Sequence, residues 1–191
     1  MSLILFSSIG PSQAGAVAKN GPAAHPAEQQ MKLYRLPNAL PVLIIPDKRF
    51  PLVSLRLYVH AGSAYETADQ AGISHLLEHM VFKGTPSRPK GQISKEVEEL
   101  GGYLNAATSF DYTVYIVDVP SSHFAKGLDI LHDMVFNAEI DHDELQSEKK
   151  VVLAELERNE DDPGNYMFQQ VARQALAGTP YERPIIGFRE T

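Results

Sequence analysis

Two histidines and a glutamate in His75-Leu76-Leu77-Glu78-His79 have the types and the spacing of a metal-dependent hydrolase site. On a helix, residues four apart lie on one face, about 40° apart around the axis. Two neutral imidazoles directed the same way can supply two ligands of a catalytic zinc, and a neighbouring carboxylate can take a proton from a water that the metal activates. The pattern H-x-x-E-H is the inversion of the common H-E-x-x-H zinc-protease signature.

A catalytic zinc site needs a third protein ligand and an open position for water. The chain has no cysteine, so histidine, aspartate and glutamate are the available ligand types. Glu148 and Glu155 are seven residues apart and would share one helix face, about 20° apart. Two valines between them suggest that this face is directed inward. A buried carboxylate is costly without a cation partner, and a divalent metal is a strong one. Both glutamates are therefore candidates for the site.

Each of these residues also has a purely structural interpretation. The two histidines could lie on a solvated helix face, with Glu78 as an ordinary helical neighbour. Glu155 could be one more exposed acid of a charged helix, and Glu148 could be a simple surface charge. The remaining histidines of the structured part lack ligand-like spacing and are expected to be surface or structural residues: His60, His123, His132 and His142.

The elements before and around the histidines follow from periodicity and from turn residues. Structure is expected to begin near Met31 with a hairpin around a proline-containing turn, followed by a strand of alternating side chains and a helix that carries the histidines. A Gly-Thr-Pro run ends this helix. The expected boundaries are Lys32–Leu36 and Val42–Ile45 for the hairpin, Leu52–His60 for the third strand, and Asp69 or Gln70 to about Lys83 for the helix.

The rest of the chain adds another antiparallel pair of strands and a run of helices. The strands are expected at Tyr103–Thr108 and Thr113–Val119, and a short helix at Ile93–Leu100. A longer helix should begin at Pro120-Ser121-Ser122, with its apolar positions at Phe124, Leu128, Leu131 and Val135. Two further helices are expected at Asp141–Glu160 and Tyr166–Ala177, separated by Asp161-Asp162-Pro163-Gly164. Strands in antiparallel groups followed by runs of helices indicate the α+β class.

Length and charge narrow the possible functions. A chain of 191 residues fits one domain, with or without a tail. Its net charge of −7 and the lack of a long basic run argue against a nucleic-acid or anionic-membrane surface. No apolar run approaches the roughly 18 residues of a membrane span. We therefore expect neither a nucleic-acid partner nor a transmembrane segment.

The two ends of the chain carry separate signals. Residues 1–30 contain a short apolar run, Leu3–Ile9, and a small-residue stretch ending at Ala16, which resemble the end of a secretory signal peptide. The alternatives are a disordered tail or a vector-derived Met1-Ser2-Leu3, with residues 17–30 as a linker. At the other end Thr191, a good helix cap, has no helix after it, so we expect residues 31–191 to be part of a longer polypeptide.

Three segments together resemble the pitrilysin/insulinase-type inverzincins, a family that includes the mitochondrial processing peptidase and many bacterial zinc proteases. They are His75–Thr85 (HLLEHMVFKGT), Gly101–Thr108 (GGYLNAAT) and Glu148–Glu155 (EKKVVLAE), and the likeness extends from about Met31 to Thr191. The resemblance implies an N-terminal peptidase half-domain of the processing-peptidase type, with an antiparallel or mixed sheet and helices packed on one side of it.

Carried over by position, the resemblance implies roles for single residues. His75, His79 and Glu155 would bind one Zn²⁺, Glu78 would be the general base, and Glu148 would orient the ligands from behind. The segment formed by Asn105, Ala106, Ala107 and Thr108 matches the family's substrate-binding edge strand, to which an extended peptide adds as a further strand. Asn105 could also bond the scissile region through its amide, or be only a polar residue near a turn.

The implied function is that of a zinc-dependent endopeptidase that hydrolyses peptide bonds through a metal-activated water. Its substrates would be peptides or unfolded polypeptides. A second homologous domain or subunit would complete the site, because the family's arginine and tyrosine from that half have no match in this chain. The alternative is a non-catalytic or partner-dependent scaffold subunit of the same fold. The signal-like start favours a periplasmic or secreted location.

Overall fold

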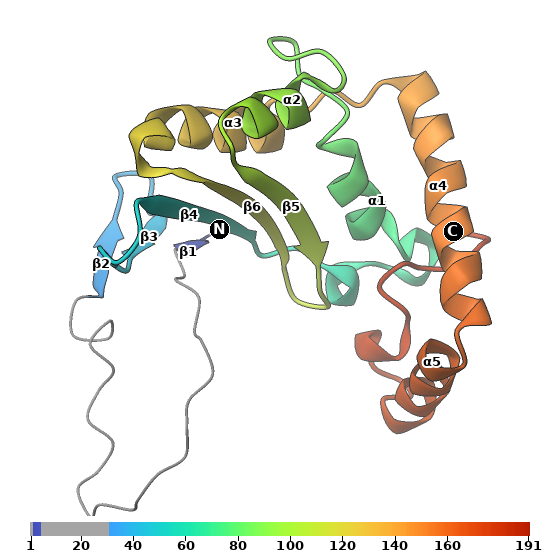
Figure 1. Cartoon of the computed structure of the whole chain (residues 1–191). Helices are drawn as coiled ribbons and strands as arrows, with labels where there is room; N and C mark the ends of the chain where they lie inside the picture. Colours follow the sequence, from blue (N-terminus) through green and yellow to red (C-terminus); the bar gives the residue numbers. More distant parts are fainter. Residues whose placement is uncertain (1, 5–30) are drawn as a thin grey trace, which may run out of the picture.

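The computed structural model describes residues 2–4 and 31–191 and consists of one six-stranded sheet with helices over and beside it (Figure 1). This confirms the α+β class. The strands are β1 (Ser2–Ile4), β2 (Lys32–Arg35), β3 (Pro41–Ile44), β4 (Leu52–Val59), β5 (Tyr103–Thr108) and β6 (Thr113–Pro120). The α-helices are α1 (Ile73–Met80), α2 (Gln92–Glu99), α3 (Phe124–Phe136), α4 (His142–Asp161) and α5 (Pro163–Ala175).

The order of the strands places β5 at one edge of the sheet. The order is β2-β3-β1-β4-β6-β5, and all neighbours are antiparallel except β1 and β3. The hairpin of β5 and β6 is in register from Tyr103 opposite Asp118 to Thr108 opposite Thr113. The outer edge of β5 is therefore free of strand pairing within the described residues, and α1 lies beside this strand.

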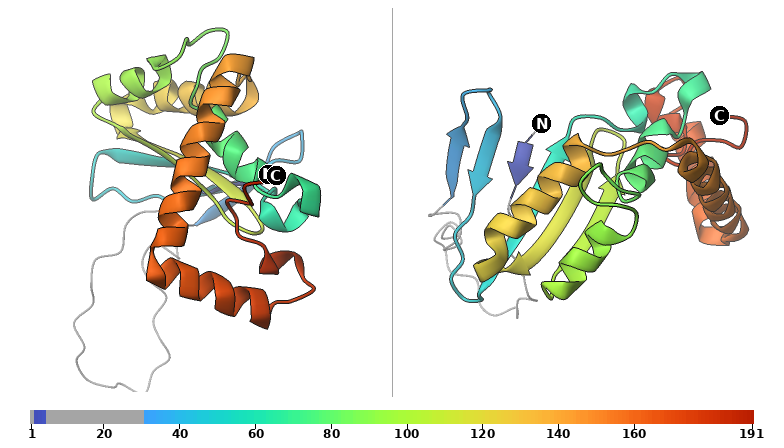
Figure 2. Two further views of the ribbon diagram at one scale, coloured as in Figure 1. Left: turned by 90° about the vertical axis from the view of Figure 1, so that its right-hand side faces the viewer. Right: turned by 90° about the horizontal axis from the view of Figure 1, so that it is seen from above.

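The hydrophobic core lies between the sheet and the pair α2 and α3, which cover one face of it (Figure 2). Leu55 and Val117 of the sheet are 0% exposed and face the equally buried Ile130 of α3. Gly127 lets the helix approach, because a Cβ there would lie 2.8 Å from a methyl group of Val119. Each fully buried aliphatic side chain contributes roughly 1.5–3 kcal/mol.

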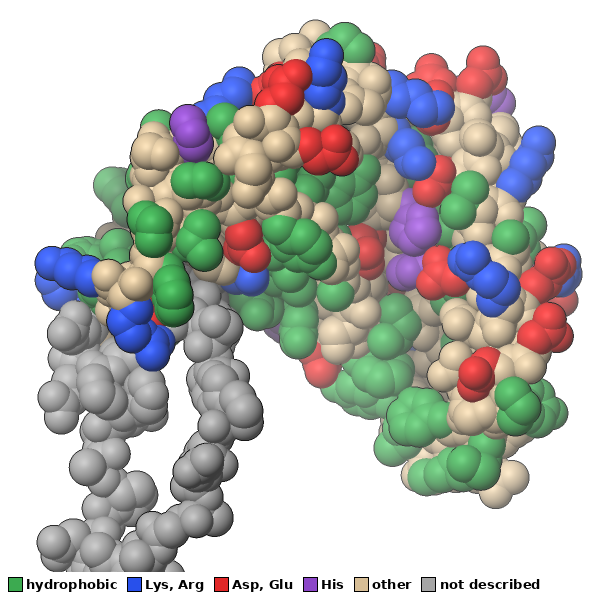
Figure 3. Space-filling model, viewed as in Figure 1, with side chains coloured by type: hydrophobic (Ala, Val, Ile, Leu, Met, Phe, Trp, Pro, Cys, Tyr) green, Lys and Arg blue, Asp and Glu red, His purple; other side chains and the backbone are tan. Residues whose placement is uncertain are grey.

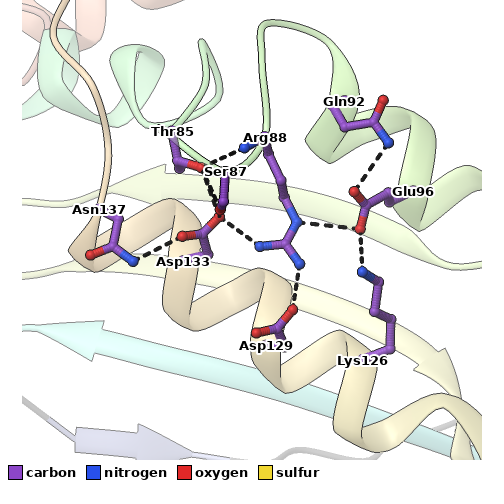
Figure 4. A network of polar contacts seen from close by, with 9 residues as sticks. All are labelled: Thr85, Ser87, Arg88, Gln92, Glu96, Lys126, Asp129, Asp133 and Asn137. Atoms are coloured by element: carbon purple, nitrogen blue, oxygen red, sulfur yellow. Dashed lines mark hydrogen bonds and ion pairs between the residues drawn. The ribbon is translucent and has the colours of Figure 1, made fainter.

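A buried arginine fastens the loop between α1 and α2 to α3 (Figure 4). The Arg88 guanidinium donates to Asp133 at 2.6 Å, to Glu96 at 3.2 Å and to Asp129. Thr85 also donates to Asp133, at 2.7 Å. Burial disfavours the charged form of Asp133, but its hydrogen bonds, including the one from Arg88, outweigh burial and hold the pKa of this carboxyl well below its usual range. The loop that leaves the histidine helix is thus fixed by charge-assisted hydrogen bonds.

The histidine helix is shorter than predicted. Its expected start at Asp69 or Gln70 is wrong, since α1 begins at Ile73 and a separate 3₁₀ turn spans Ala68–Gln70. The break is at Gly72, whose φ of 97° lies in the left-handed region that glycine favours. The expected end near Lys83 is also late, because α1 ends at Met80.

The residues at the junction of α4 and α5, predicted to interrupt one helix, begin the next. The side chain of Asp162 accepts from the backbone N–H of Asn165 and caps α5, and Pro163 occupies the first helical position. The predicted resumption at Tyr166 is therefore three residues late.

The predicted signal remnant and linker fall in residues 1–30 and lie outside the described residues, apart from Ser2–Ile4. These three form β1 between β3 and β4, a strand that was not predicted from the sequence. Among the described residues, no helix is both long and apolar enough to cross a membrane.

Candidate metal centre

Two helices that are distant in sequence bring three potential ligands together. His75 and His79 extend from α1 toward Glu155 of α4. Nε2 of His75 lies 3.8 Å from Oε1 of Glu155, and Nε2 of His79 lies 3.6 Å from Oε2. One ligand atom from each residue lies within 4.8 Å of the others. In the space-filling view, histidine atoms with carboxylates beside them reach the surface where α1 faces α4 (Figure 3).

The geometry and the chemistry of these three side chains fit a divalent metal. Nitrogen and oxygen ligands of a tetrahedral zinc, at bond lengths of about 2.0–2.2 Å, lie roughly 3.3–3.6 Å from one another. The observed separations of 3.6 and 3.8 Å are close to that range. Burial lowers the pKa of His75, despite the opposing charge of Glu155, and so favours the neutral ring that can act as a ligand. Within the described part of the chain, no other group of His, Asp and Glu side chains converges in this way.

Glu148 lies behind His79 and is buried, with 6% of its surface exposed. Its Oε1 lies 2.9 Å from Nδ1 of His79, and its Oε2 lies 2.5 Å from Nζ of Lys83. Burial raises the pKa of this carboxyl, but the hydrogen bonds from Lys83 and His79 outweigh it and leave the pKa below its usual value. An ionised carboxylate can only accept, so Nδ1 of His79 donates and its Nε2 keeps the lone pair that a metal requires.

Glu78 lies between the two histidines in sequence and is half-buried at the end of β5. The hydroxyl of Thr108 donates a hydrogen bond to its Oε2. Tyr115 of β6 is buried nearby, and burial, together with the negative charge of Glu78, raises its pKa to about 12. Tyr115 is therefore protonated at neutral pH and cannot take the role of a base.

The four predicted residues of β5 divide between the site and the sheet. Ala107 and Thr108 border the cavity in front of the histidines. Ala106 is buried in the core, and Asn105 is exposed on the strand; neither is among the residues that line the cavity. The edge position predicted for this segment agrees with the sheet order.

A cavity of about 680 Å³ opens in front of the site, and α5 together with residues 181–190 forms its far wall. This wall was not predicted from the sequence. The available signal was the run Tyr166-Met167-Phe168, three consecutive large apolar residues that are all more than half exposed. The pairing of Lys83 with Glu148 was not predicted either, because a lysine just beyond a helix end is unremarkable in sequence.

The side chain of Glu66 caps the start of α1. The carboxylate of Glu66 accepts from the backbone N–H groups of Gly72 and Ser74, at 2.8 and 2.7 Å. These are N–H groups that the first turn of a helix leaves without partners. Glu66 therefore fixes the first turn of the helix that carries both histidines.

Comparison with known proteins gives consistent matches. The sequence profile of the family described as Insulinase (Peptidase family M16) matches residues 42–188. A protein of Rickettsia felis named uncharacterized zinc protease is 34% identical over 164 residues, which cover 86% of this chain and 40% of that protein. Cytochrome b-c1 complex subunit 1 of Mus musculus is 34% identical over 131 residues, covering 69% of this chain and 27% of that protein.

Solved structures agree with these sequence matches. A protease from Helicobacter pylori superposes with a TM-score of 0.79 at 29% identity, over 83% of this chain and 38% of that one. The periplasmic protease PqqL from Escherichia coli gives a TM-score of 0.78 at 28% identity, over 87% of this chain and 19% of that one. The chain thus spans less than half of the length of these relatives and structures.

Proposed function

This chain belongs to the insulinase family of peptidases, family M16, and on that premise we propose that it is the metal-bearing part of a zinc-dependent endopeptidase. The observation that carries the proposal is the convergence of His75, His79 and Glu155, with Glu78 at the adjoining end of β5. Three ligands leave one position open, as catalytic rather than structural zinc sites do.

In this proposal each residue of the site has a distinct role. His75, His79 and Glu155 hold a zinc ion, which when bound polarises a peptide carbonyl and acidifies water. Glu78 accepts a proton from the attacking water and returns it to the leaving amine. Thr108 holds one oxygen of Glu78, and Glu148 orients His79. The hydroxyl of Tyr115 stays protonated and takes no part in these transfers.

The substrate would be a peptide or an unfolded polypeptide lying along β5. The edge of β5 that pairs with no strand of the described residues can hold an extended chain by main-chain hydrogen bonds, with Asn105 to Thr108 as the contact segment. The cavity of about 680 Å³ next to Ala107 and Thr108 offers room for side chains near the cleaved bond. The relatives are more than twice as long as this chain, which supports a second homologous unit closing over the substrate.

A non-catalytic scaffold is the second candidate, and the likeness to cytochrome b-c1 complex subunit 1 is the observation that favours it. The peptidase is favoured by Glu78, because a purely structural metal site needs no base. A periplasmic or secreted location is proposed as well, supported by the signal-like start and by the likeness to the periplasmic protease of Escherichia coli.

The test is the zinc content of purified wild type beside Glu78→Gln and Glu155→Gln, with cleavage of an unstructured peptide followed on the same samples. We expect about one zinc per chain in wild type, because the three ligands are already assembled. Glu78→Gln should keep the zinc and lose cleavage, whereas Glu155→Gln should lose the zinc.

Glu157→Gln is the matched control, since Glu157 is an exposed acid two residues further along α4 and pairs with Arg189. It should change neither zinc content nor cleavage. Folded wild type without stoichiometric zinc would refute the metal site and favour the scaffold. Zinc without cleavage would point to the need for the second unit or a partner.

A further inference from the structure

The two histidines of the site are supported unequally. Nδ1 of His79 faces the carboxylate of Glu148 at 2.9 Å. Nδ1 of His75, in contrast, is buried without a hydrogen-bond partner among the described residues. A neighbouring carboxylate therefore sets the orientation and tautomer of His79 but not those of His75. A residue that positions Glu148 also affects the orientation of His79.

Lys83 is the cation that faces Glu148. Its Nζ lies 2.5 Å from Oε2, while His79 takes Oε1, so each oxygen of the carboxylate has one partner. The side chains of Glu148 and Lys83 are 8% and 23% exposed, so water screens the pair only partly. Without Lys83, a buried negative charge would face only a neutral imidazole, at a substantial desolvation cost.

The backbone fixes the place from which Lys83 reaches Glu148. The N–H of Lys83 donates to the carbonyl of Met80 at 3.0 Å, which continues the turn beyond the end of α1. Two residues later, Thr85 is fastened to α3 through Asp133 at 2.7 Å. Lys83 thus lies on a short segment held at both ends, and its ammonium is directed across to α4.

We propose that Lys83 is a positioning residue for the metal centre and acts through Glu148. Lys83 holds Oε2 of Glu148 and so leaves Oε1 placed to accept from Nδ1 of His79, which keeps the Nε2 lone pair of His79 directed toward Glu155 and His75. This deepens the proposed function and rests on it, because the ligand that Lys83 serves is one of the three proposed for zinc.

The experiment compares wild type with Lys83→Met, which removes the charge and keeps a side chain of similar length. The zinc Kd is measured by competition with a chromophoric chelator, and the tautomer of His79 is read from ¹⁵N shifts of its ring in metal-free protein. We expect Lys83→Met to weaken zinc binding about tenfold or more, and the His79 ring to become a mixture of both tautomers. Lys83→Arg keeps the positive charge and should restore both values.

Lys149→Met is the matched control, since Lys149 is exposed and adjacent to Glu148 in sequence. It should leave Kd and tautomer unchanged. If Lys83→Met fails to fold by circular dichroism, Lys83→Gln takes its place. Unchanged Kd and unchanged tautomer in a folded variant would overturn the proposal. If wild type binds no zinc, the proposed metal site fails, and the tautomer in metal-free protein alone decides whether Lys83 orients His79.

Discussion

Only one carboxylate oxygen of Glu78 accepts a hydrogen bond from a neighbouring side chain among the described residues. The hydroxyl of Thr108 donates to Oε2, and within the described residues Oε1 of Glu78 has no hydrogen-bond partner. A carboxylate fixed through one oxygen can present the other to a substrate without losing its orientation. Thr108 therefore acts on the orientation of the base rather than on the metal.

Removing this hydroxyl with Thr108→Val should lower the cleavage rate by about tenfold or more, since a hydrogen bond to a charged group contributes about 1.5–3 kcal/mol. The zinc content should stay at the wild-type value, because Thr108 is not one of the three ligands and its hydroxyl donates to Glu78. Steady-state kinetics and metal analysis of one preparation test this. Thr108→Ser keeps the hydroxyl and should retain most of the activity. An unchanged rate for Thr108→Val would show that the Thr108 hydroxyl does not orient Glu78 for cleavage.

Much of the histidine arrangement could be predicted from sequence because it is local. Residues four apart share a helix face whatever surrounds them, so the pairing of His75 and His79 needed no tertiary information. The choice of Glu155 over neighbouring acids depended on how α4 packs against α1, and spacing within α4 does not encode that. The roles of Lys83 and of the Thr108 hydroxyl also escaped prediction, because both are long-range contacts of common surface residue types.

Among the elements, α1 is short and depends on supports at both ends. Its first turn is capped by Glu66, and the loop beyond its last turn is fastened to α3 by Arg88. The sequence did not reveal that Gly72 separates α1 from the preceding 3₁₀ turn, because an isolated glycine in a helical pattern is often tolerated. The close approach of the backbone at Ile186 requires it, since a Cβ on Gly72 would lie 2.5 Å from that carbonyl oxygen.

Arg88→Met should destabilise the protein by about 3–5 kcal/mol, because it leaves the buried carboxylate of Asp133 without its cation. Urea unfolding at pH 7 measures the change. Lys126→Met is the control on the same network, since this half-exposed lysine pairs with Glu96 and its loss should cost less than about 1 kcal/mol. Equal losses for the two variants would contradict the central role of Arg88.

The same network predicts how stability depends on acid. The hydrogen bond from Lys126, aided by Gln92 and Arg88 against the effect of burial, lowers the pKa of Glu96 to about 2, and the pKa of Asp133 is lowered as well. Both carboxyls bind protons more weakly in the folded than in the unfolded protein. Their contribution to the free energy of unfolding is therefore complete above about pH 5 and is lost as the pH falls toward 2. Urea unfolding between pH 5 and pH 3 should show this loss in wild type and a smaller one in Arg88→Met.

At the scale of the whole molecule, α4 packs against α1 and carries α5 at its far end (Figure 2). No residue of α5 is buried, and Tyr166, Met167, Phe168 and Val171 are all more than half exposed. A helix was predicted here over Tyr166–Ala177, and α5 lies at Pro163–Ala175. The position of the helix depends on its contacts with α4 and with the 3₁₀ turn Pro180–Glu182, which are long-range contacts that a local sequence pattern does not encode.

Zinc bound between α1 and α4 should stabilise the whole chain. At a free zinc concentration of about 100 times Kd, the gain is about 2.7 kcal/mol, or roughly 5–10 °C in Tm for a chain of this size. Thermal unfolding with zinc and with a chelator measures the difference. The shift should be absent in Glu155→Gln, and a similar shift in that variant would mean that zinc binds elsewhere.

The pairing of α1 with α4 also has a consequence for the chain as a polymer. His79 and Glu155 are 76 residues apart in sequence, and a metal held by both closes a ring that contains α2, β5, β6 and α3. Closing a long ring restricts the unfolded ensemble more than closing a short one. The bound ion would therefore act as a cross-link between two segments that are far apart in sequence, and its removal would release the ring between them.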